Sequence, residues 1–473
     1  MPITFDSSNS VYSTTGQAYT ATSSDSIILS DTGHLISTVN DALVLGGTGQ
    51  NYNLNIGGTI ATYALGYAGI YMGSPNTVDI RLNYGGNIYA YGAGLYLWGA
   101  ANVYNAGSIV TSSSRFAAVH FEETSGDYTI NNSGLISGAS GDAIRLSGSG
   151  VHTIDNSGVV QSFPNYHAIL STHASGTDNV TNTGVLRGIV DLGGGNDTLD
   201  TTHGRVLFDV RMGAGTDTFH GSNFIDTVYG GADADRLNGA GAVDYLYGEG
   251  GADILDGGAG ADQLTGGSEN DTYIVDHRLD VIVETAGGGT LDIVRAKVSF
   301  TLAADDNIEQ LQTFDPAGTA AINLTGNGLA QGIQGNAGAN RLSGAGGNDV
   351  LAGGRGNDVL TGGANDDSFL FNTALNARLN VDRITDFSAP RDTIVLENSL
   401  AGTFRALANG FLTEAAFEAN DTGTATGASD RIIYNTRTGA LSYDANGSSA
   451  GGAVQFAVLS TKPAISHADF FVI

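Results

Sequence analysis

Short apolar segments recur through the first third of the chain at intervals of 24 to 27 residues. Each has the form small–apolar–x–apolar, and the copies begin at Ala42, Gly69, Gly94, Ala118, Ala143 and Ala168. This alternation is typical of a β-strand, in which successive side chains point to opposite faces. A companion motif repeats in phase, as in NAGSIV at 105–110 and NSGVV at 156–160. A period near 25 residues, with strands separated by Asn/Gly turns, predicts a parallel β-helix over residues 1–190.

The alternation assigns side chains to the inside or the outside of the coils. The apolar residue after the small one is expected to point inward: Leu43, Ile70, Leu95, Val119, Ile144 and Ile169. The next residue then points outward, and stacked coils about 4.8 Å apart align these residues in one column. Within this column, the candidates for a ligand or assembly surface are Tyr71, Tyr96, His120 and Arg145. The alternative is that they only stiffen the stack through cross-strand contacts.

A second periodicity begins at Met212, where seven nonapeptides follow one another without a break to Ile274. The sixth position of each is an aspartate: Asp217, Asp226, Asp235, Asp244, Asp253, Asp262 and Asp271. Two positions later stands an apolar or aromatic residue: Phe219, Val228, Leu237, Leu246, Leu255, Leu264 and Tyr273. This spacing of two residues between the aspartate and the apolar residue predicts very short strands with inward side chains. Glycines, which adopt turn conformations at little cost, would join the strands. The pattern predicts a stack of equal turns with a carboxylate at each corner.

The spacing of these carboxylates predicts bound cations. With two nonapeptides per turn, alternate aspartates fall on the same edge, about 4.8 Å apart. Carboxylates at that distance repel by roughly 1 kcal/mol per pair even in water. Calcium removes this repulsion, because it accepts about six to eight oxygen ligands in flexible geometry and can also bind the turn carbonyls. Magnesium demands a tighter octahedron and fits less well. We therefore expect several calcium ions along the stack.

The best copy of the repeat is GGAGADQLT at 257–265. It resembles the GGxGxDxUx nonapeptide of the repeats-in-toxin (RTX) family. A second block from Gly335 to Leu370 follows the same pattern, and LGGGNDTLD, ending at Asp200, is an isolated copy. The resemblance implies a right-handed parallel β-roll with calcium between successive turns.

The predicted calcium ligands are Asp197, Asp217, Asp226, Asp235, Asp244, Asp253, Asp262, Asp271, Asp349, Asp358 and Asp367. Some copies depart from the family pattern. Phe224 and Ala242 replace the fourth-position glycine, Ala240 and Glu249 replace the second, and Asn340 stands at one sixth position. The calcium sites beside the altered glycines are expected to be less fully occupied than those in intact copies.

These patterns divide the chain into five predicted segments, and the predicted fold class is all-β. The segments are a β-helix at 1–190, a first roll at 191–274, a β-rich spacer at 275–325, a second roll at 326–371 and a C-terminal β-rich cap at 372–473. In the cap, 431–447 predicts a β-hairpin, and Asp382, Asp386 and Asp392 are possible additional ligands or capping groups. The last residues, ISHADFFVI, resemble a type I secretion signal; a plain terminal strand is the alternative.

Composition narrows the classes of partner. The formal charge is 19 − 48 = −29, which argues against nucleic acid and anionic lipid surfaces. The chain has no cysteine, so disulfides and thiol chemistry are excluded. No stretch has eighteen consecutive apolar residues, so no membrane span is expected. The N-terminal sequence MPITFDSSNS lacks the features of a secretory signal peptide, and export is expected to use another signal.

The sequence contains no obvious catalytic constellation. None of the nine histidines has the HExxH spacing of the serralysin proteases. Carboxylates and a basic residue of the kind used by polysaccharide lyases and epimerases are scattered over the predicted coils: Glu122, Glu123, Asp142, Arg145 and Asp155. That enzyme class stays open as the weakest alternative, and no catalytic residue is predicted.

The leading functional hypothesis is a type I-secreted structural protein, extracellular or at the cell surface. It would assemble with itself, in a calcium-dependent way, into a bacterial surface layer, fibre or matrix. The N-terminal coils resemble those of surface-layer and adhesin proteins, and the expected partners are further copies of the chain, in a homo-oligomer or lattice. The second hypothesis is an adhesin that binds a cell-surface polysaccharide through the tyrosine column.

Overall fold

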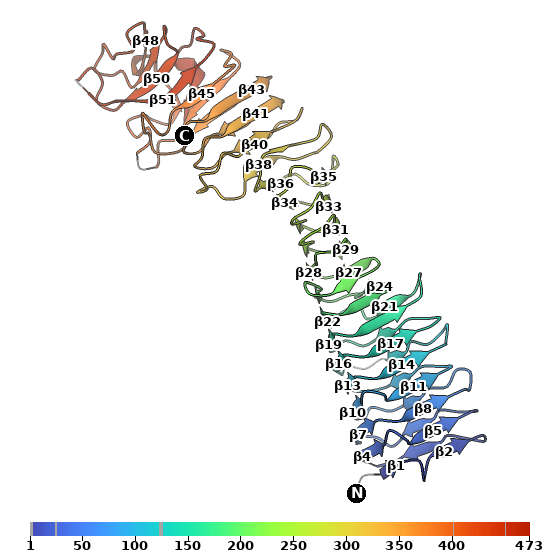
Figure 1. The fold of residues 1–473 in the computed structure, drawn as a ribbon. Coiled ribbons are helices and arrows are strands. Elements are labelled where there is room, and N and C mark those ends of the chain that lie inside the picture. Colours follow the sequence, from blue (N-terminus) through green and yellow to red (C-terminus); the bar gives the residue numbers. More distant parts are fainter. Residues whose placement is uncertain (1–2, 24–25, 123–125, 401, 450) are drawn as a thin grey trace. The chain divides into compact units, whose positions relative to one another are not determined.

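The computed structural model describes residues 3–23, 26–122, 126–400, 402–449 and 451–473 (Figure 1). Glu123, one of the scattered carboxylates, lies outside these ranges. The described chain consists of β-strands, turns and two short 3-10 helices, which confirms the predicted all-β class of a parallel β-helix with β-rolls. It forms two compact units, Met1–Thr265 and Gly266–Ile473. No helix in the described ranges is both long enough and apolar enough to cross a membrane.

The strands of the N-terminal unit pair in parallel and in chain order on three faces. Face 1 contains β1 (Ile3–Phe5), β4 (Ser26–Leu29), β7 (Asn51–Ile56), β10 (Thr77–Leu82), β13 (Ala101–Asn105), β16 (Tyr128–Asn132), β19 (Val151–Asn156), β22 (Thr177–Asn182), β25 (Thr198–Asp200), β28 (Thr218–His220), β30 (Arg236–Asn238) and β32 (Ile254–Asp256). Face 2 contains β2 (Val11–Ser13), β5 (His34–Ser37), β8 (Thr59–Thr62), β11 (Asn87–Ala90), β14 (Ser108–Thr111), β17 (Leu135–Gly138), β20 (Val159–Ser162), β23 (Val185–Arg187) and β26 (Arg205–Val206). Face 3 contains β3 (Tyr19–Ala21), β6 (Leu43–Leu45), β9 (Ile70–Met72), β12 (Leu95–Leu97), β15 (Val119–Phe121), β18 (Ile144–Leu146), β21 (His167–Ser171), β24 (Ile189–Asp191), β27 (Val210–Ala214), β29 (Thr227–Ala232) and β31 (Tyr245–Gly250).

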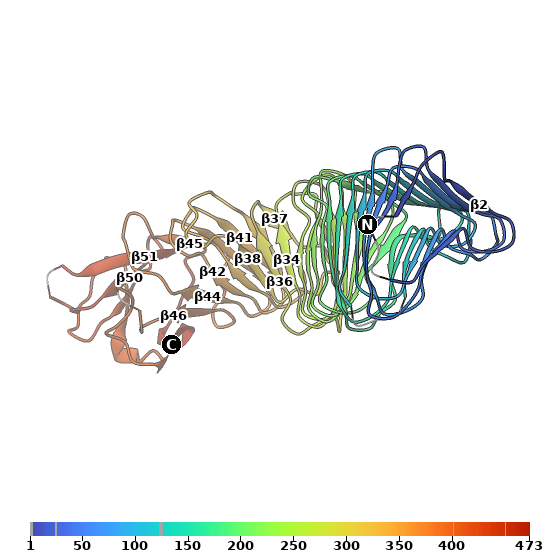
Figure 2. The ribbon, with the colours of Figure 1, turned by 90° about the horizontal axis from the view of Figure 1, so that it is seen from below.

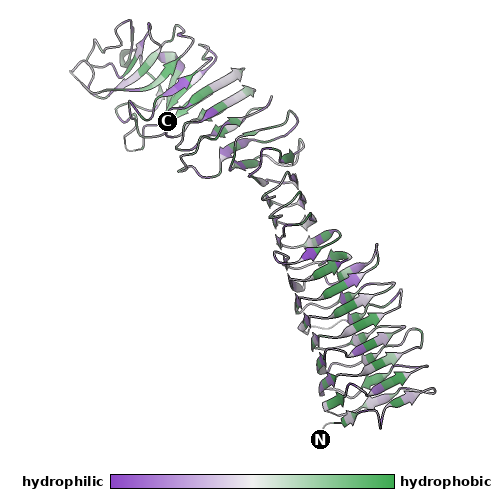
Figure 3. Ribbon diagram, viewed as in Figure 1, coloured by the Kyte–Doolittle hydropathy of each residue, from purple (hydrophilic) through white to green (hydrophobic). Residues whose placement is uncertain are grey.

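The core of this unit lies inside the coils, because every second side chain of a strand points inward. The expected inward residues of face 3 are paired in register, as in Leu95 with Ile70 and Leu95 with Val119. All three are fully buried. In Figure 2 the successive coils, coloured from blue to green, lie one behind another. Figure 3 shows hydrophobic residues concentrated along the strands.

The coils change from three strands to two where the nonapeptides begin. Face 2 ends at β26. Among the residues that the structure describes, the later coils, as far as β31, are built only from strands of faces 1 and 3. Phe219 and Leu237 are paired in neighbouring coils of face 1, and Val228 and Leu246 in face 3. Nine residues are enough for one short strand and one turn, so two nonapeptides close a coil.

The C-terminal unit contains two sheets. One has β34 (Thr272–Val275), β36 (Ile293–Ala296), β38 (Gln310–Thr313), β40 (Gly332–Gln334), β42 (Val350–Ala352), β44 (Ser368–Phe371), β46 (Thr393–Leu396), β52 (Phe470–Val472) and β47 (Gly410–Phe411). The other has β37 (Phe300–Thr301), β39 (Leu324–Thr325), β41 (Arg341–Gly346), β43 (Val359–Ala364), β45 (Asp382–Ile384), β51 (Ala453–Leu459), β50 (Ala440–Asp444), β49 (Ile432–Asn435) and β48 (Phe417–Asn420). Further elements are β33 (Gln263–Ser268), β35 (Val281–Val283), η1 (Glu414–Ala416) and η2 (His467–Asp469).

The predicted spacer is built into the first of these sheets. Its strands β36 and β38 pair in parallel with β34 on one side and β40 on the other. Val294 and Leu311 continue the buried row of the roll. In the cap, β49 and β50 form the predicted antiparallel hairpin. The terminal strand β52 pairs in parallel with β46.

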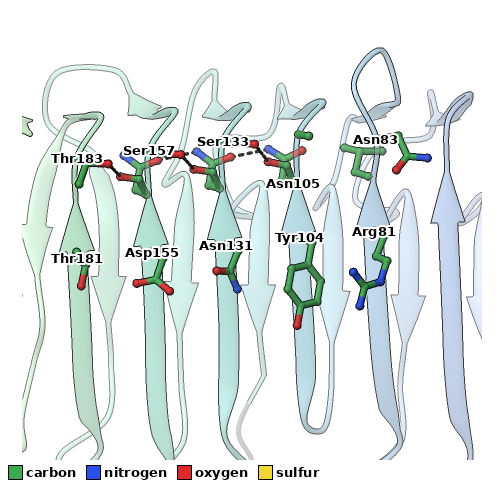
Figure 4. Close-up of a pocket in the computed structure, with 14 residues that line it drawn as sticks. Arg81, Asn83, Tyr104, Asn105, Asn131, Ser133, Asp155, Ser157, Thr181 and Thr183 are labelled. Carbon is green, nitrogen blue, oxygen red and sulfur yellow. Dashed lines mark hydrogen bonds between the residues drawn. The ribbon is translucent and has the colours of Figure 1, made fainter.

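Buried asparagines form a continuous hydrogen-bonded row along face 1 of the β-helix. Each side-chain amide donates to the next side-chain carbonyl at 2.7 Å, from Asn105 to Asn132, from Asn132 to Asn156 and from Asn156 to Asn182. Asn105, Asn132 and Asn156 of this row also line a groove of about 410 Å³, and Figure 4 shows this part of the row from the labelled Asn105. Together with bonds to backbone carbonyls, such as that from Asn105 to Leu135, the row satisfies these buried amides.

Candidate calcium sites and an aromatic surface

Aspartates line both edges of the roll in the N-terminal unit, in the two predicted rows. On one edge the backbone N–H of Asp217 donates to Oδ1 of Asp235 at 2.8 Å, and that of Asp235 donates to Asp253 at 2.7 Å. On the other edge Asp226 donates to Asp244, and Asp244 to Asp262, each at 2.8 Å. Each bond joins residues one coil apart. The pairing of the strands therefore also fixes the position of the carboxylate in the next coil. Asp197 donates in the same way to Asp217 at 2.7 Å.

The second oxygen of these carboxylates fits a bound cation. Asp197, Asp217, Asp235 and Asp244 each have a buried Oδ2 without a hydrogen-bond partner, and Asp226 has a buried Oδ1 in the same condition. A buried ionised carboxylate is costly unless a positive charge lies beside it. The donor set is entirely oxygen, as calcium prefers.

Glycine is required beside the carboxylates for reasons of space. A Cβ on Gly239 would lie 2.4 Å from Oδ2 of Asp244, and one on Gly230 would lie 2.5 Å from Oδ2 of Asp235. The copies that depart from the family pattern keep the turn at a cost. Ala240, Ala242 and Glu249 have φ of 72°, 83° and 73°. This left-handed conformation costs a residue with a Cβ about 1 to 2 kcal/mol.

The C-terminal unit repeats the arrangement. Asp349 donates to Asp367 at 3.0 Å, and Asn340 donates to Asp358 at 2.7 Å. Two aspartates of the cap extend these rows. Asp358 donates to Asp382 at 3.0 Å and Asp367 donates to Asp392 at 3.1 Å. Asp386 instead accepts from the N–H groups of Gly362 and Gly363.

These rows contain further acidic residues that were not predicted from the sequence. Asp271 donates to Asp292 at 2.7 Å and Asp292 donates to Glu309 at 2.8 Å, both in the predicted spacer. Asp271, Glu284 and Asp292 offer ligand oxygens that lie within 4.8 Å of one another. In the N-terminal unit, Asp178 precedes Asp197 in the row. The sequence signal for Asp292 and Glu309 is only an acidic residue just before a strand, because the regular spacing is lost.

Burial raises the pKa of the roll aspartates Asp217, Asp226, Asp235 and Asp244 far above their ordinary value. The pKa of Asp226 rises to about 6, that of Asp217 to about 7, and those of Asp235 and Asp244 to about 8. Neighbouring carboxylates of the same row add to the shift for Asp235 and Asp244. Without a cation the roll therefore favours protonated aspartates.

These shifts predict that protonation stabilises the calcium-free roll. A raised folded-state pKa stabilises the metal-free roll below the ordinary value of 3.8, and this contribution is lost as the pH rises through about 6 to 8. The unfolded chain is already ionised in this range, so the calcium-free roll should gain folded structure as the pH falls from 8 to 6. The folding equilibrium constant is expected to change by about tenfold per pH unit for each proton bound. Circular dichroism in calcium-free buffer at fixed ionic strength measures it, and a β-signal independent of pH would contradict it.

A comparison with known families identifies the repeats. The sequence model of the RTX calcium-binding nonapeptide repeat matches residues 213–246, 238–273 and 334–369. The chain contains RTX calcium-binding nonapeptide repeats. RTX nonapeptides bind calcium ions, which agrees with the orphaned carboxylate oxygens of both units. No curated protein matches the chain.

The RTX segments contain all the predicted ligands except Asp197, which precedes the matched residues. The β-helix before them also lies outside the match. Calcium binding is therefore a property of the RTX coils, and the surface chemistry of the β-helix must be considered separately.

An aromatic surface lies on face 3 of the β-helix and in the turns before it. It consists of Tyr63, Tyr67, Tyr71, Tyr91, Tyr96 and Phe116. Tyr71 and Tyr96 stack with ring centroids 5.5 Å apart, and Tyr63 and Tyr91 lie 6.1 Å apart. Four of the six, Tyr67, Tyr71, Tyr96 and Phe116, line a cavity of about 410 Å³ that also contains Asp41.

Polar side chains continue the column beyond the aromatic surface. The His120 ring packs at a tilt against Tyr96, with centroids 4.8 Å apart. Its Nε2 lies 3.2 Å from Glu122, which also accepts a hydrogen bond from the Tyr96 hydroxyl. In the next coils, Asp142 contacts Arg145 at 2.7 Å and His167 at 2.9 Å. Of the scattered groups, Asp142 and Arg145 are therefore in contact, three residues apart along the chain, and the coil period adds His167 to the same carboxylate. Asp155 does lie apart, on face 1 (Figure 4).

Proposed function

We propose that this RTX-repeat protein is secreted and that calcium folds it into a structural element that assembles with further copies at a bacterial surface. Export fits a chain whose rolls fold on binding calcium, because cytosolic calcium is too low to close them before secretion. The assembled form would be a layer, fibre or matrix. The five segments proposed from the sequence would then have two tasks, with the rolls sensing calcium and the β-helix making the contacts.

The observation that carries this proposal is the set of exposed aromatic side chains on the β-helix. Tyr63 is 55% exposed, Tyr91 45% and Tyr67 40%. Tyr12, Tyr84 and Trp98 add further exposed rings in the same unit. Rigid aromatic surfaces of this kind are typical of sites that bind other molecules. Their position on a stack of coils keeps them in fixed geometry, which a repeating lattice contact requires.

A specific observation favours carbohydrate binding as the second candidate. The cavity beside Tyr71 and Tyr96 combines aromatic rings with the carboxylate of Asp41, and sugars are bound through their apolar ring faces and their hydroxyl groups. Burial raises the pKa of Asp41, and one of its carboxylate oxygens accepts a hydrogen bond from the N–H of Ala68. An adhesin that holds a cell-surface polysaccharide would use the same residues as the assembly contact.

One pair of variants separates these functions. In the calcium-loaded protein, Tyr71→Ala with Tyr96→Ala is expected to abolish ordered assemblies seen by electron microscopy, because it removes two walls of the cavity. Tyr229→Ala with Tyr247→Ala is the matched control, since these tyrosines also stack, at 4.9 Å, but lie on the roll. If assembly persists and pull-down on polysaccharides is lost, the carbohydrate function holds instead. If both persist, neither function resides in this surface.

A further inference from the structure

A buried cluster of two histidines and an aspartate lies where the β-helix meets the first roll. His152 belongs to β19, Asp178 to β22, and His173 to the turn between β21 and β22. His152 and Asp178 are paired in register, and the backbone N–H of Asp178 donates to Oδ1 of Asp197 at 2.7 Å. The cluster therefore occupies the same row as the roll aspartates, one coil before Asp197. It precedes the residues matched by the RTX repeat.

The three side chains converge on one point inside the coil. Nδ1 of His152 lies 2.7 Å from Oδ1 of Asp178, and Nε2 of His173 lies 3.2 Å from Oδ2. The exposed fractions are 1% for His152, 0% for Asp178 and 9% for His173. The His152 ring is held on one side by Tyr128, with centroids 4.8 Å apart, and on the other by His173 at 5.1 Å. The nitrogens are thus positioned by packing before any ligand binds.

The hydrogen-bond partners of His173 depend on whether a proton or a metal ion lies between its Nε2 and Asp178. Its Nδ1 is 2.8 Å from the carbonyl of Gly194 and 3.0 Å from the N–H of Gly176. A proton on Nε2 leaves Nδ1 free to accept from Gly176. A metal ion on Nε2 moves the proton to Nδ1, which then donates to Gly194. A backbone carbonyl that holds the outer nitrogen is the usual support of a metal-binding histidine.

The donor set selects a different metal from that of the roll. Imidazole nitrogen suits zinc, copper and nickel, whereas calcium takes oxygen ligands. Tetrahedral zinc with bonds of about 2.0 to 2.1 Å separates its ligand atoms by about 3.3 Å. The contacts of His173 with the two Asp178 oxygens, at 3.2 and 3.3 Å, already have this spacing, and the 2.7 Å contact between His152 and Asp178 must lengthen by about 0.6 Å. The ligand atoms of the three residues lie within 4.8 Å of one another, so one ion can reach all of them.

We propose that His152, His173 and Asp178 form a binding site for zinc at the head of the aspartate row. The site would end the calcium-binding row with an ion of a different class and join the last three-strand coils to the roll. It is independent of the proposed assembly function, because its residues are buried and lie away from the aromatic surface.

Zinc titration of the calcium-saturated full chain tests this site. Isothermal calorimetry should show one high-affinity zinc per chain, lost in His173→Gln and in His152→Phe, which keeps the ring stacking. His203→Gln is the matched control, because His203 is exposed and should leave zinc binding unchanged. X-ray absorption of the zinc-loaded native chain provides a measurement that needs no variant. Two imidazole ligands support the site. No bound zinc, zinc retained in His173→Gln or a spectrum without two imidazoles overturns it and leaves a proton as the occupant.

Discussion

Removal of calcium is expected to unfold the RTX coils while the β-helix stays folded. The roll aspartates lie one coil apart with buried oxygens that have no hydrogen-bond partner, as for Asp217, Asp235 and Asp244. Neighbouring carboxylates repel by roughly 1 kcal/mol per pair in water and more strongly when buried. The two-strand coils have little apolar core to offset this cost, since each nonapeptide contributes one large inward side chain. Metal binding and folding of such coils are one event.

Hydrogen–deuterium exchange with mass spectrometry measures the expected difference along the chain. In a calcium chelator, peptides from 213–246 and 334–369 should lose their protection by a factor of at least about 100, whereas peptides from 126–190 should keep theirs. Added calcium should restore protection, and magnesium should not, because its octahedral preference does not fit these turns. Protection of the RTX segments that persists in chelator would show that the roll folds without calcium.

The sequence predicted the rows of the roll because equal coils convert a regular spacing directly into neighbours in space. Asp217 and Asp235 are two nonapeptides apart, and this distance is one coil. The same rule failed where the coils differ in length. From Asp271 to Asp292 the row advances by 21 residues and from Asp292 to Glu309 by 17, so no fixed period could find them. Strand pairing, not spacing, sets their positions.

The polar clusters of the β-helix were missed for a related reason. Asp142 meets His167 across 25 residues, and His152 meets Asp178 across 26. The apolar pattern gave the period of the coils, but it did not show which turn residues point toward the next coil. Contacts such as that between His120 and Glu122 also depend on side-chain rotamers, which no periodicity specifies.

Replacement of Asn132 by alanine is expected to lower the free energy of unfolding of the β-helix by about 3 kcal/mol or more. Asn132 donates to Asn156 and accepts from Asn105, both at 2.7 Å, in a fully buried row. The substitution leaves Asn156 Oδ1 without its donor and weakens the bonding of the Asn105 amide. Each buried polar group left without a partner costs about 1 to 3 kcal/mol. Urea unfolding followed by circular dichroism, in chelator so that only the β-helix is folded, measures the change.

The neighbouring Asn131 provides the control, because it stands on the same strand but points outward (Figure 4). Asn131→Ala should change the free energy of unfolding by less than about 0.5 kcal/mol. The loss in Asn132→Ala should be the same with and without calcium, since Asn132 bonds to other asparagines and to backbone carbonyls of the β-helix. A loss that appears only in calcium, or an equal loss in both variants, would contradict this assignment. In the first case the stability of the β-helix would depend on the roll. In the second case the buried amides would not be what fixes the coils in register.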